Sequence, residues 1–291
     1  MKKALRDVLD LLDLEPIEVN MFRGMSPDEG WQRVYGGQVI GQALVAASRT
    51  VEDENRIAHS LHGYFLRPGD TTIPIVYSVD RIRDGKSFNT RRVVAIQRGE
   101  AIFSMSASFQ VIEEGLNHHI PMPDADSPDD CPSQEELRES YIEDIPEEYR
   151  DNFLNRSDPI EMRFQDGVND FKPDPMPPNQ RVWIKAVDTM PEDVRLHQCV
   201  LAYASDMTLM DNAIRPHGIG WTDKNLQTAS LDHAMWFHEP FRVDQWLLYY
   251  QDSPYSGGAR GFNRGSFYTQ DGRLIASATQ EGLMRLHQKD D

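Results

Sequence analysis

The 291-residue sequence predicts an α+β protein in which one unit, a helix followed by antiparallel strands, is present twice. The first observation is an internal match, because residues 65–110 align with residues 237–282 at a constant offset of 172 without gaps. The second is that each copy reads as one helical run followed by four β-rich runs with turn residues between them. The register pairs Pro68 with Pro240, Gly85 with Gly257 and Arg92 with Arg264. Such a register indicates a duplication.

The helix of the first copy is expected over residues 37–49, and that of the second over residues 191–210. Gly36 and Gly37 suit the turn before the first helix, and Pro191 suits the first turn of the second. In the second copy the strands are expected at about 228–238, 244–252, 259–269 and 273–285. An antiparallel sheet curled around one long helix is the hotdog fold, so two copies predict a double hotdog.

The predicted organisation is an N-terminal unit over residues 1–115, a linker over 116–180 and a C-terminal unit over 181–291. Residues 113–161 hold sixteen Asp or Glu against three Arg, and the linker is rich in Pro. A long, partly ordered surface segment with a short helix near residues 133–141 is therefore expected. At the N-terminus, Leu5, Val8, Leu9 and Leu12 fall at helical spacing, which predicts a short amphipathic helix rather than a signal peptide.

The net charge of −17 argues against nucleic acid and anionic membranes as partners, because both attract basic surfaces. The uncharged run at residues 101–112 is too short to span a bilayer. Basic residues between positions 67 and 98 could attract one small anion, although neutralising nearby acids is their commoner role. Cys131 and Cys199 lack the spacing of a disulfide framework or zinc site. We therefore expect a cytoplasmic protein without a metal or other cofactor.

Common hydrolytic motifs are missing from the sequence. There is no G-x-S-x-G string, and Arg242 stands where a metalloprotease motif beginning at His238 needs its second His. Polar residues inside apolar runs of the second copy are the remaining candidates, namely Asp206, Ser230 and Gln280. Taken singly, each is more often a hydrogen-bonded structural group.

The duplication changes that balance. The offset of 172 aligns Ser230 with Ala58 and Gln280 with Ser108, and aligning Gln38 with Gln198 places Asp206 opposite Ala46. The first copy thus lacks the acid and the amide, as expected if one copy is active and the other supports it.

Long strings carry a resemblance to a known family. The segments SLDHAMWFHEPF and ARGFNRGSFYTQDGRLIASATQEGLMR, with VYGGQVIGQALVAA and HGYFLRPGD earlier, closely resemble the acyl-CoA thioesterase II (TesB-type) family. The resemblance implies a double hotdog that hydrolyses fatty acyl-CoA to free acid and CoA, as a homo-oligomer, either dimer or tetramer. It also implies a catalytic set of Asp206, Ser230 and Gln280. Bacterial members often have Thr where this chain has Ser230.

The expected mechanism is attack by one water, without a covalent intermediate. Asp206 would accept the proton of the water, with a pKa raised by burial, while Ser230 and Gln280 orient it. Backbone N–H groups near Gly36 and Gly37 would stabilise the oxyanion. Met235 and Trp236 could line an acyl tunnel, although such residues are more often core.

Two other classes remain open on the sequence. A hotdog hydratase pairs its Asp with a His about five residues on, but here that residue is Asp211. A non-catalytic acyl-CoA binder would need no Asp–Ser–Gln set. His233 and His238 are expected to be structural strand residues rather than bases.

Overall fold

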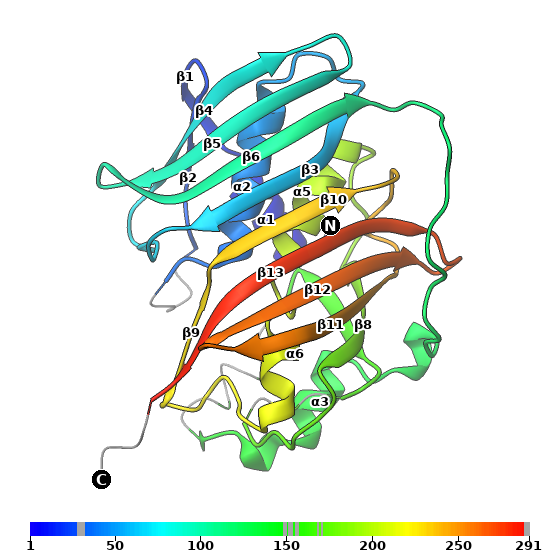
Figure 1. The fold of residues 1–291 in the computed structure, drawn as a ribbon. Helices are drawn as coiled ribbons and strands as arrows, with labels where there is room; N and C mark the ends of the chain where they lie inside the picture. Colours follow the sequence, from blue (N-terminus) through cyan, green and yellow to red (C-terminus); the bar gives the residue numbers. More distant parts are fainter. Residues whose placement is uncertain are drawn as a thin grey trace.

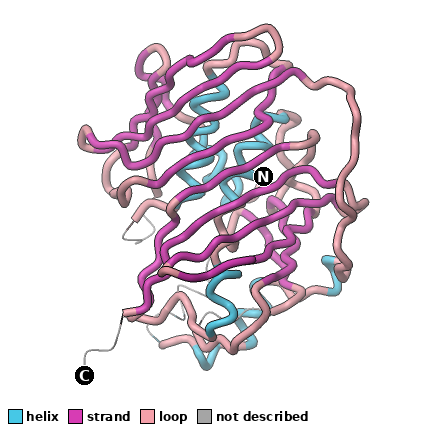
Figure 2. The backbone as a smooth tube through the Cα atoms, viewed as in Figure 1, coloured by secondary structure: helices cyan, strands magenta, loops and turns pink. Residues whose placement is uncertain are grey.

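The computed structural model describes residues 1–27, 33–147, 150, 154, 157–167, 169 and 171–287. Its strands form one 13-stranded antiparallel sheet, and the helices α2 and α5 lie together on one side of it (Figure 1). Figure 2 shows the same layering, with the strands in magenta and the helices in cyan. None of the described helices is long and apolar enough to cross a membrane.

The first half contains α1 (Lys3–Leu12), β1 (Glu15–Glu18), β2 (Met21–Gly24), α2 (Gly36–Arg49), β3 (Arg56–Phe65), β4 (Ile75–Asp84), β5 (Phe88–Gln97) and β6 (Glu100–Val111). Between the halves lie the short helix α3 (Gln134–Ser140) and two 3-10 turns, Pro128–Asp130 and Ile142–Asp144. The second half contains β7 (Ile160–Phe164), β8 (Asn179–Ala186), α5 (Val194–Ala204), α6 (Asp211–Ile214), the 3-10 turn Arg215–His217, β9 (Leu226–Ser230), β10 (Asp232–Phe237), β11 (Leu247–Gly257), β12 (Arg260–Thr269) and β13 (Leu274–Leu286).

The order of the strands is the same in both halves. Counted outward from the middle of the sheet, it is β3-β6-β5-β4-β2-β1 in the first half and β10-β13-β12-β11-β8-β7 in the second. The two halves join where β3 pairs antiparallel with β10, with Leu61 opposite Met235 and Gly63 opposite His233. This is the predicted double hotdog, and the repeated strand order supports the interpretation of a duplication.

The ungapped offset of 172 is wrong in the last strand of each copy. Gly63 pairs with Met105, whereas Met235, 172 residues after Gly63, pairs with Ala278, which is 173 residues after Met105. Pairing between the preceding strands gives the same shift, because Val93 also faces Met105 while Gly265 faces Ala278. The turn before β13 is therefore one residue longer than the turn before β6. The counterpart of Gln280 is Ala107 rather than Ser108.

The helix α2 forms the centre of the first half, and twelve of its 14 residues are buried. It packs closely against α5 because two of its glycines, Gly37 and Gly41, lie where the helices meet. A Cβ on Gly37 would lie 2.2 Å from the carbonyl oxygen of Tyr203, and one on Gly41 would lie 3.2 Å from that of Cys199. The Gly-rich start of α2 is thus a packing requirement as well as a turn signal.

The second helix is shorter than predicted. It begins after Asp193, whose side chain accepts hydrogen bonds from the N–H groups of Arg195 and Leu196, so Pro191 lies outside it. It ends at Ala204, and the Ser205 hydroxyl donates to the carbonyl of Ala202 at 2.9 Å. Asp206 therefore lies in the turn after α5, and not on the helix as the sequence suggested.

The described part of the region between the halves contains regular structure. The predicted short helix is α3, where Ser133 and Glu136 form a reciprocal capping box. β7 lies inside the range predicted as linker and forms the edge of the sheet, so the second half starts earlier than residue 181. At the N-terminus, α1 has the predicted amphipathic pattern, with Leu5, Val8 and Leu12 buried.

Candidate active site

Asp206 and Gln280 form the centre of the candidate site. The Gln280 amide Nε2 donates a hydrogen bond of 2.6 Å to Asp206 Oδ1. The backbone N–H of Gly37, at the start of α2, donates a second hydrogen bond to the same carboxylate. The other oxygen, Oδ2, lies beside Gly36, because a Cβ built on Gly36 would be 2.6 Å from it. The carboxylate of the second half thus meets the helix N-terminus of the first half, where the helix dipole favours negative charge.

The environment makes Asp206 a stronger base than an ordinary aspartate. Burial raises the pKa of Asp206 to about 6, although the hydrogen bonds from Gln280 and Gly37 oppose that rise. The direction agrees with the expectation from the sequence. At neutral pH this carboxylate is mostly ionised and can still accept a proton efficiently.

Gln280 is completely buried on the helix-facing side of β13, together with Ala276 and Ala278. Strand parity in the sequence placed it there correctly. Its Nε2 is committed to Asp206, while its Oε1 has no hydrogen-bond partner among the described residues. Opposite it on β12 lies the buried Asn263, whose amide donates to the Gln280 carbonyl at 3.4 Å. A buried amide oxygen of this kind is available to orient a small polar molecule.

Ser230 lies near this pair without bonding to it. It is the last residue of β9 and pairs with Gly282, two residues after Gln280 on β13. The chain is irregular between β9 and β10, and β3 has a register shift at the matching place, between Ala58 and Ser60. Such bulges change the direction of a side chain. The hydroxyl contacts Met210 Sδ at 3.6 Å, and among the described residues it has no hydrogen bond to Asp206 or Gln280.

A cavity of about 330 Å³ adjoins this group. Its wall includes Ser230 and Gly36, the residue beside which Asp206 Oδ2 lies, whereas Asp206 and Gln280 themselves do not line it. The rest of the inner wall is apolar, formed by Val34, Val39, Phe65, Ile102 and Phe103. The exposed side chains of Arg33 and Arg67 also line it and lie toward solvent. A buried apolar end and a cationic rim suit an amphipathic, anionic ligand.

A larger cavity, of about 430 Å³, lies elsewhere, between the linker and α6. Its wall mixes the charged residues Asp144, Asp166, Lys172 and Arg215 with Trp221. None of Asp206, Ser230 and Gln280 lines it. The smaller cavity is therefore the better candidate, because residues that touch the Asp206 carboxylate form part of its wall.

The residues suggested for an acyl tunnel are separated by the sheet. Met235 is fully buried, whereas its neighbour Trp236 is partly exposed, in keeping with the alternation of side chains along β10. Trp236 makes an edge-to-face contact with the exposed His62. Neither residue lines the 330 Å³ cavity, so the structure does not bring them together at the site.

Other nucleophiles and bases are poorly placed for catalysis. Burial lowers the pKa of His233 to about 3, so its ring is neutral, and its Nε2 lies 2.9 Å from the Ser205 hydroxyl. Burial raises the pKa of Cys199 to about 12, and burial together with nearby aspartates raises that of Cys131. Within the described ranges, no group of three His, Cys, Asp or Glu could hold a metal ion.

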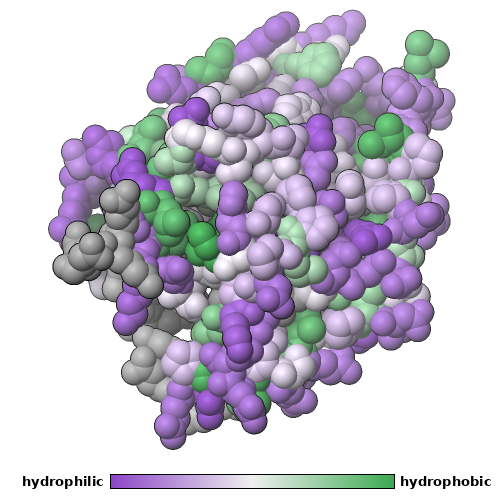
Figure 3. Space-filling model, turned by 60° about the horizontal axis from the view of Figure 1, so that its bottom comes forward, coloured by the Kyte–Doolittle hydropathy of each residue, from purple (hydrophilic) through white to green (hydrophobic). Residues whose placement is uncertain are grey.

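The basic stretch of the first copy is mostly neutralised. Arg81 pairs with Glu52, Arg91 with Asp84 and Arg98 with Asp70. Arg67 pairs with Glu100 at 3.3 Å and is also the one basic residue of that stretch that lines the cavity. Hydrophilic residues cover most of the face in Figure 3, with small hydrophobic groups among them. Of this stretch, Arg67 is therefore the basic residue that lies at the rim of the cavity.

Comparisons with known proteins find matches over most of the chain. Two family profiles match the chain, one described as acyl-CoA thioesterase over residues 151–283 and one as the acyl-CoA thioesterase N-terminal domain over residues 27–110. Acyl-CoA thioesterase 2 of Haemophilus influenzae is 39% identical over 285 residues, which cover 98% of this chain and 99% of that protein. The chain belongs to the acyl-CoA thioesterase II family. It is therefore an enzyme, a thioester hydrolase.

Further relatives cover the same length. Acyl-coenzyme A thioesterase 8 of mouse is 40% identical over 97% of this chain and 90% of that protein. The crystal structure of an acyl-CoA thioesterase II from Mycobacterium marinum has a TM-score of 0.75 and 42% identity, over 96% of this chain and 98% of that one. The resemblance and the double-hotdog fold predicted from the sequence are thus confirmed.

Several polar residues near the site were missed in the sequence. Thr208, Asn212 and Gln251 form a buried cluster next to Asp206. The signal that identified Gln280 applies equally to Gln251, which shares strand parity with the apolar Leu247 and Tyr249. Parity alone gives no contact between strands, so the link from Gln251 to Asp206 required the fold.

Proposed function

We propose that the chain hydrolyses fatty acyl-CoA by direct attack of a water molecule that Asp206 deprotonates. The observation that carries the proposal is the partly buried Asp206 carboxylate, hydrogen-bonded to Gln280 and to the start of α2 beside a cavity. A thioester is activated enough for water to attack it without a covalent enzyme intermediate. One positioned base and one stabilised oxyanion are then sufficient.

The roles follow from the contacts of each group. Gln280 Nε2 holds Asp206, and its buried Oε1 accepts a hydrogen bond from the attacking water. Ser230, in the cavity wall, supplies a hydroxyl that turns from Met210 Sδ toward the same water when substrate is bound. The N–H of Gly37 already donates to Asp206. The oxyanion therefore accepts hydrogen bonds from the other N–H groups in the first turn of α2, beginning with that of Gly36.

The cavity fits the two ends of such a substrate. Its apolar inner wall, with Val39, Phe65 and Phe103, takes the hydrocarbon next to the thioester. The guanidinium groups of Arg33 and Arg67 at the rim face the phosphates of CoA, although the chain as a whole carries a charge of −17. The homo-oligomer stays a prediction of the family resemblance.

The test is thiol release from palmitoyl-CoA and from crotonyl-CoA, with hydration of crotonyl-CoA followed in parallel. We expect thiol release from palmitoyl-CoA and no hydration. Hydration without thiol release would identify a hydratase. Saturable binding of palmitoyl-CoA without any reaction would identify a binding protein, and either result would end the proposal.

A further inference from the structure

A buried polar cluster lies next to the turn that carries Asp206. It consists of Thr208, Asn212, Gln180 and Gln251, whose exposed fractions are at most 6%. Gln251 is the centre, because its Oε1 accepts from Gln180 Nε2 at 2.9 Å and from Asn212 Nδ2 at 2.8 Å. Its Nε2 donates to Thr208 Oγ1 at 2.6 Å. None of the four lines the 330 Å³ cavity, so they make no direct contact with substrate there.

The cluster holds the backbone of the catalytic turn. After α5 ends at Ala204, side chains bind several of the next carbonyl groups, of which that of Thr208 also accepts a hydrogen bond from the N–H of Asp211 at 3.2 Å. Tyr249 Oη donates to the carbonyl of Ser205 at 2.9 Å, Gln180 Nε2 to that of Thr208 at 3.1 Å, and Asn212 Nδ2 to that of Leu209 at 2.9 Å. On both sides of Asp206, side chains from β8, β11 and α6 therefore hold the backbone carbonyl groups by hydrogen bonds.

Among the described residues of the first copy, the matching place holds no such cluster. The counterpart of Gln251, 172 residues earlier, is Val79, a buried apolar residue. Paired strands confirm this match, because Val79 faces Val93 and Gln251 faces Gly265. Burying an amide where an apolar side chain would pack is unfavourable unless the amide is fully bonded. The cluster therefore accompanies the working carboxylate rather than the fold in general.

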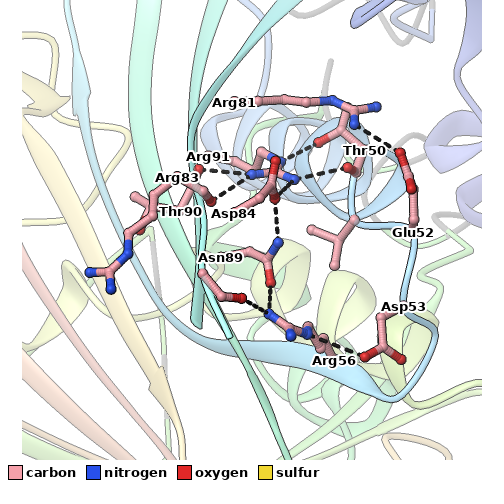
Figure 4. A network of polar contacts seen from close by, with 12 residues as sticks. Thr50, Glu52, Asp53, Arg56, Arg81, Arg83, Asp84, Asn89, Thr90 and Arg91 are labelled. Carbon is pink, nitrogen blue, oxygen red and sulfur yellow. Dashed lines mark hydrogen bonds and ion pairs between the residues drawn. The ribbon is translucent and has the colours of Figure 1, made fainter. Parts of the chain in front are cut away.

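The first copy has a different polar network after its own helix, shown in Figure 4. There the buried Arg91 donates from Nε to Thr50 Oγ1 at 2.8 Å and from Nη2 to the half-exposed Asp84. Thr50 itself is the residue at which α2 ends. This network fixes the end of α2, far along the helix from Gly36. It gives a matched comparison, because Thr50 and Thr208 are both buried threonines bonded to a buried polar side chain.

We propose that Thr208 and Gln251 are positioning residues that set the orientation of the Asp206 carboxylate for catalysis. The inference rests on the proposed role of Asp206 as the base. A misplacement of reacting groups by about 1 Å costs up to a hundredfold in rate. Thr208→Val removes the hydroxyl at nearly constant volume, and we expect it to lower kcat about tenfold or more for palmitoyl-CoA. KM should stay within about twofold, because the cavity wall is unchanged.

Thr208→Ser keeps the hydroxyl and is expected to retain kcat within about twofold of the wild-type value. The matched control is Thr50→Val, which loses the hydrogen bond to Arg91. Thr50→Val is expected to lower the melting temperature by about as much as Thr208→Val does, while leaving kcat unchanged. Should Thr208→Val not fold, Gln251→Asn, which shortens the amide by one methylene, is assayed with the same expected loss of kcat.

The outcomes separate the two proposals. If the wild-type chain does not hydrolyse palmitoyl-CoA, the proposed function fails. If the wild type is active and Thr208→Val or Gln251→Asn keeps the wild-type kcat, the positioning role fails. It also fails if Thr50→Val and Thr208→Val lower kcat equally, because a general loss of stability would then explain both.

Discussion

Replacing Asp206 with asparagine is expected to make the folded chain more stable while it removes catalysis. The carboxylate is held in a site where burial disfavours its charge, and the raised pKa of Asp206, about 6, is the measure of that effect. Asparagine has the same shape and no charge. Its amide can donate to Gln280 Oε1 and its oxygen can accept from Gly37, if the Gln280 amide rotates by half a turn. The hydrogen bonds are thus preserved and the buried charge is removed.

The size of the effect follows from the two pKa values of Asp206. The ordinary aspartate value is 3.8 and the folded value is about 6, so the folded protein holds this proton more tightly than the unfolded chain. Stability is therefore lost as pH rises from about 4 to about 6, and the loss is complete above that. Two pKa units correspond to about 3 kcal/mol, an upper value because the side chain is partly exposed. At roughly 2 °C per kcal/mol, Asp206→Asn should melt up to about 6 °C higher at pH 8.

The assay compares melting temperatures of the wild type and of Asp206→Asn between pH 4 and pH 8, together with palmitoyl-CoA hydrolysis. The difference in melting temperature should be small at pH 4 and largest above pH 6. The rate should fall by on the order of 10²–10⁴ at neutral pH. A variant that is less stable than the wild type at pH 8, or whose stability difference does not vary with pH, would refute the burial argument. Wild-type turnover by the variant would remove Asp206 from the mechanism.

Three further predictions concern the same site. The wild-type kcat should fall about tenfold per pH unit below pH 6, where Asp206 becomes protonated. A His233→Gln variant should keep that pH profile. If the substitution of His233 changed the profile, Asp206 would not be the base. Gln280→Ala should fold and lower kcat by on the order of a hundredfold, measured with palmitoyl-CoA, and a change in melting temperature alone would return Gln280 to a structural role. Arg67→Ala should raise KM severalfold for palmitoyl-CoA but not for palmitoyl-pantetheine, which lacks the nucleotide phosphates. The control Arg98→Ala, outside the cavity, should change KM for neither substrate. If Arg67→Ala raised KM equally for both substrates, a contact between Arg67 and the phosphates would be excluded.

Patterns with a short period could be predicted well from the sequence. Strand parity identified Gln280 as an inward-facing amide, and helical spacing identified α1, because each depends on one element only. The unit repeat was also recognisable, because most of the aligned segment keeps one register between the two copies. The residue types of the candidate site could thus be found before any contact was known.

Features set by pairing or by tertiary contacts could not be predicted. The counterpart of Gln280 was misassigned because one extra residue in a turn changes the register of everything after it. The end of α5 was placed too late because Met207 and Met210 continue the apolar spacing, while the Ser205 hydroxyl binds back to Ala202 and the chain turns. β7 was not predicted because it lies in an acidic, Pro-rich segment and is recognised as a strand by its pairing with β8.

The duplicated fold contributes to the site unequally from its two halves. Asp206 and Gln280 belong to the second half, but the helix N-terminus that meets the carboxylate, at Gly36 and Gly37, belongs to the first.

At the opposite end of the helix pair, the start of α5 presents Arg195. Its guanidinium donates to the carbonyl oxygens of Ser48 and Val51, both at 3.2 Å, and of Arg56 at 3.1 Å. A cation that satisfies carbonyl groups at the end of α2 occupies the place that a carboxylate and its substrate would need. The residues matching Ser230 and Gln280 there are Ala58 and Ala107, which cannot orient water. In the proposed mechanism the first copy is therefore the structural partner of a single site, and neither half holds the whole group of Asp206, Gln280 and the start of α2.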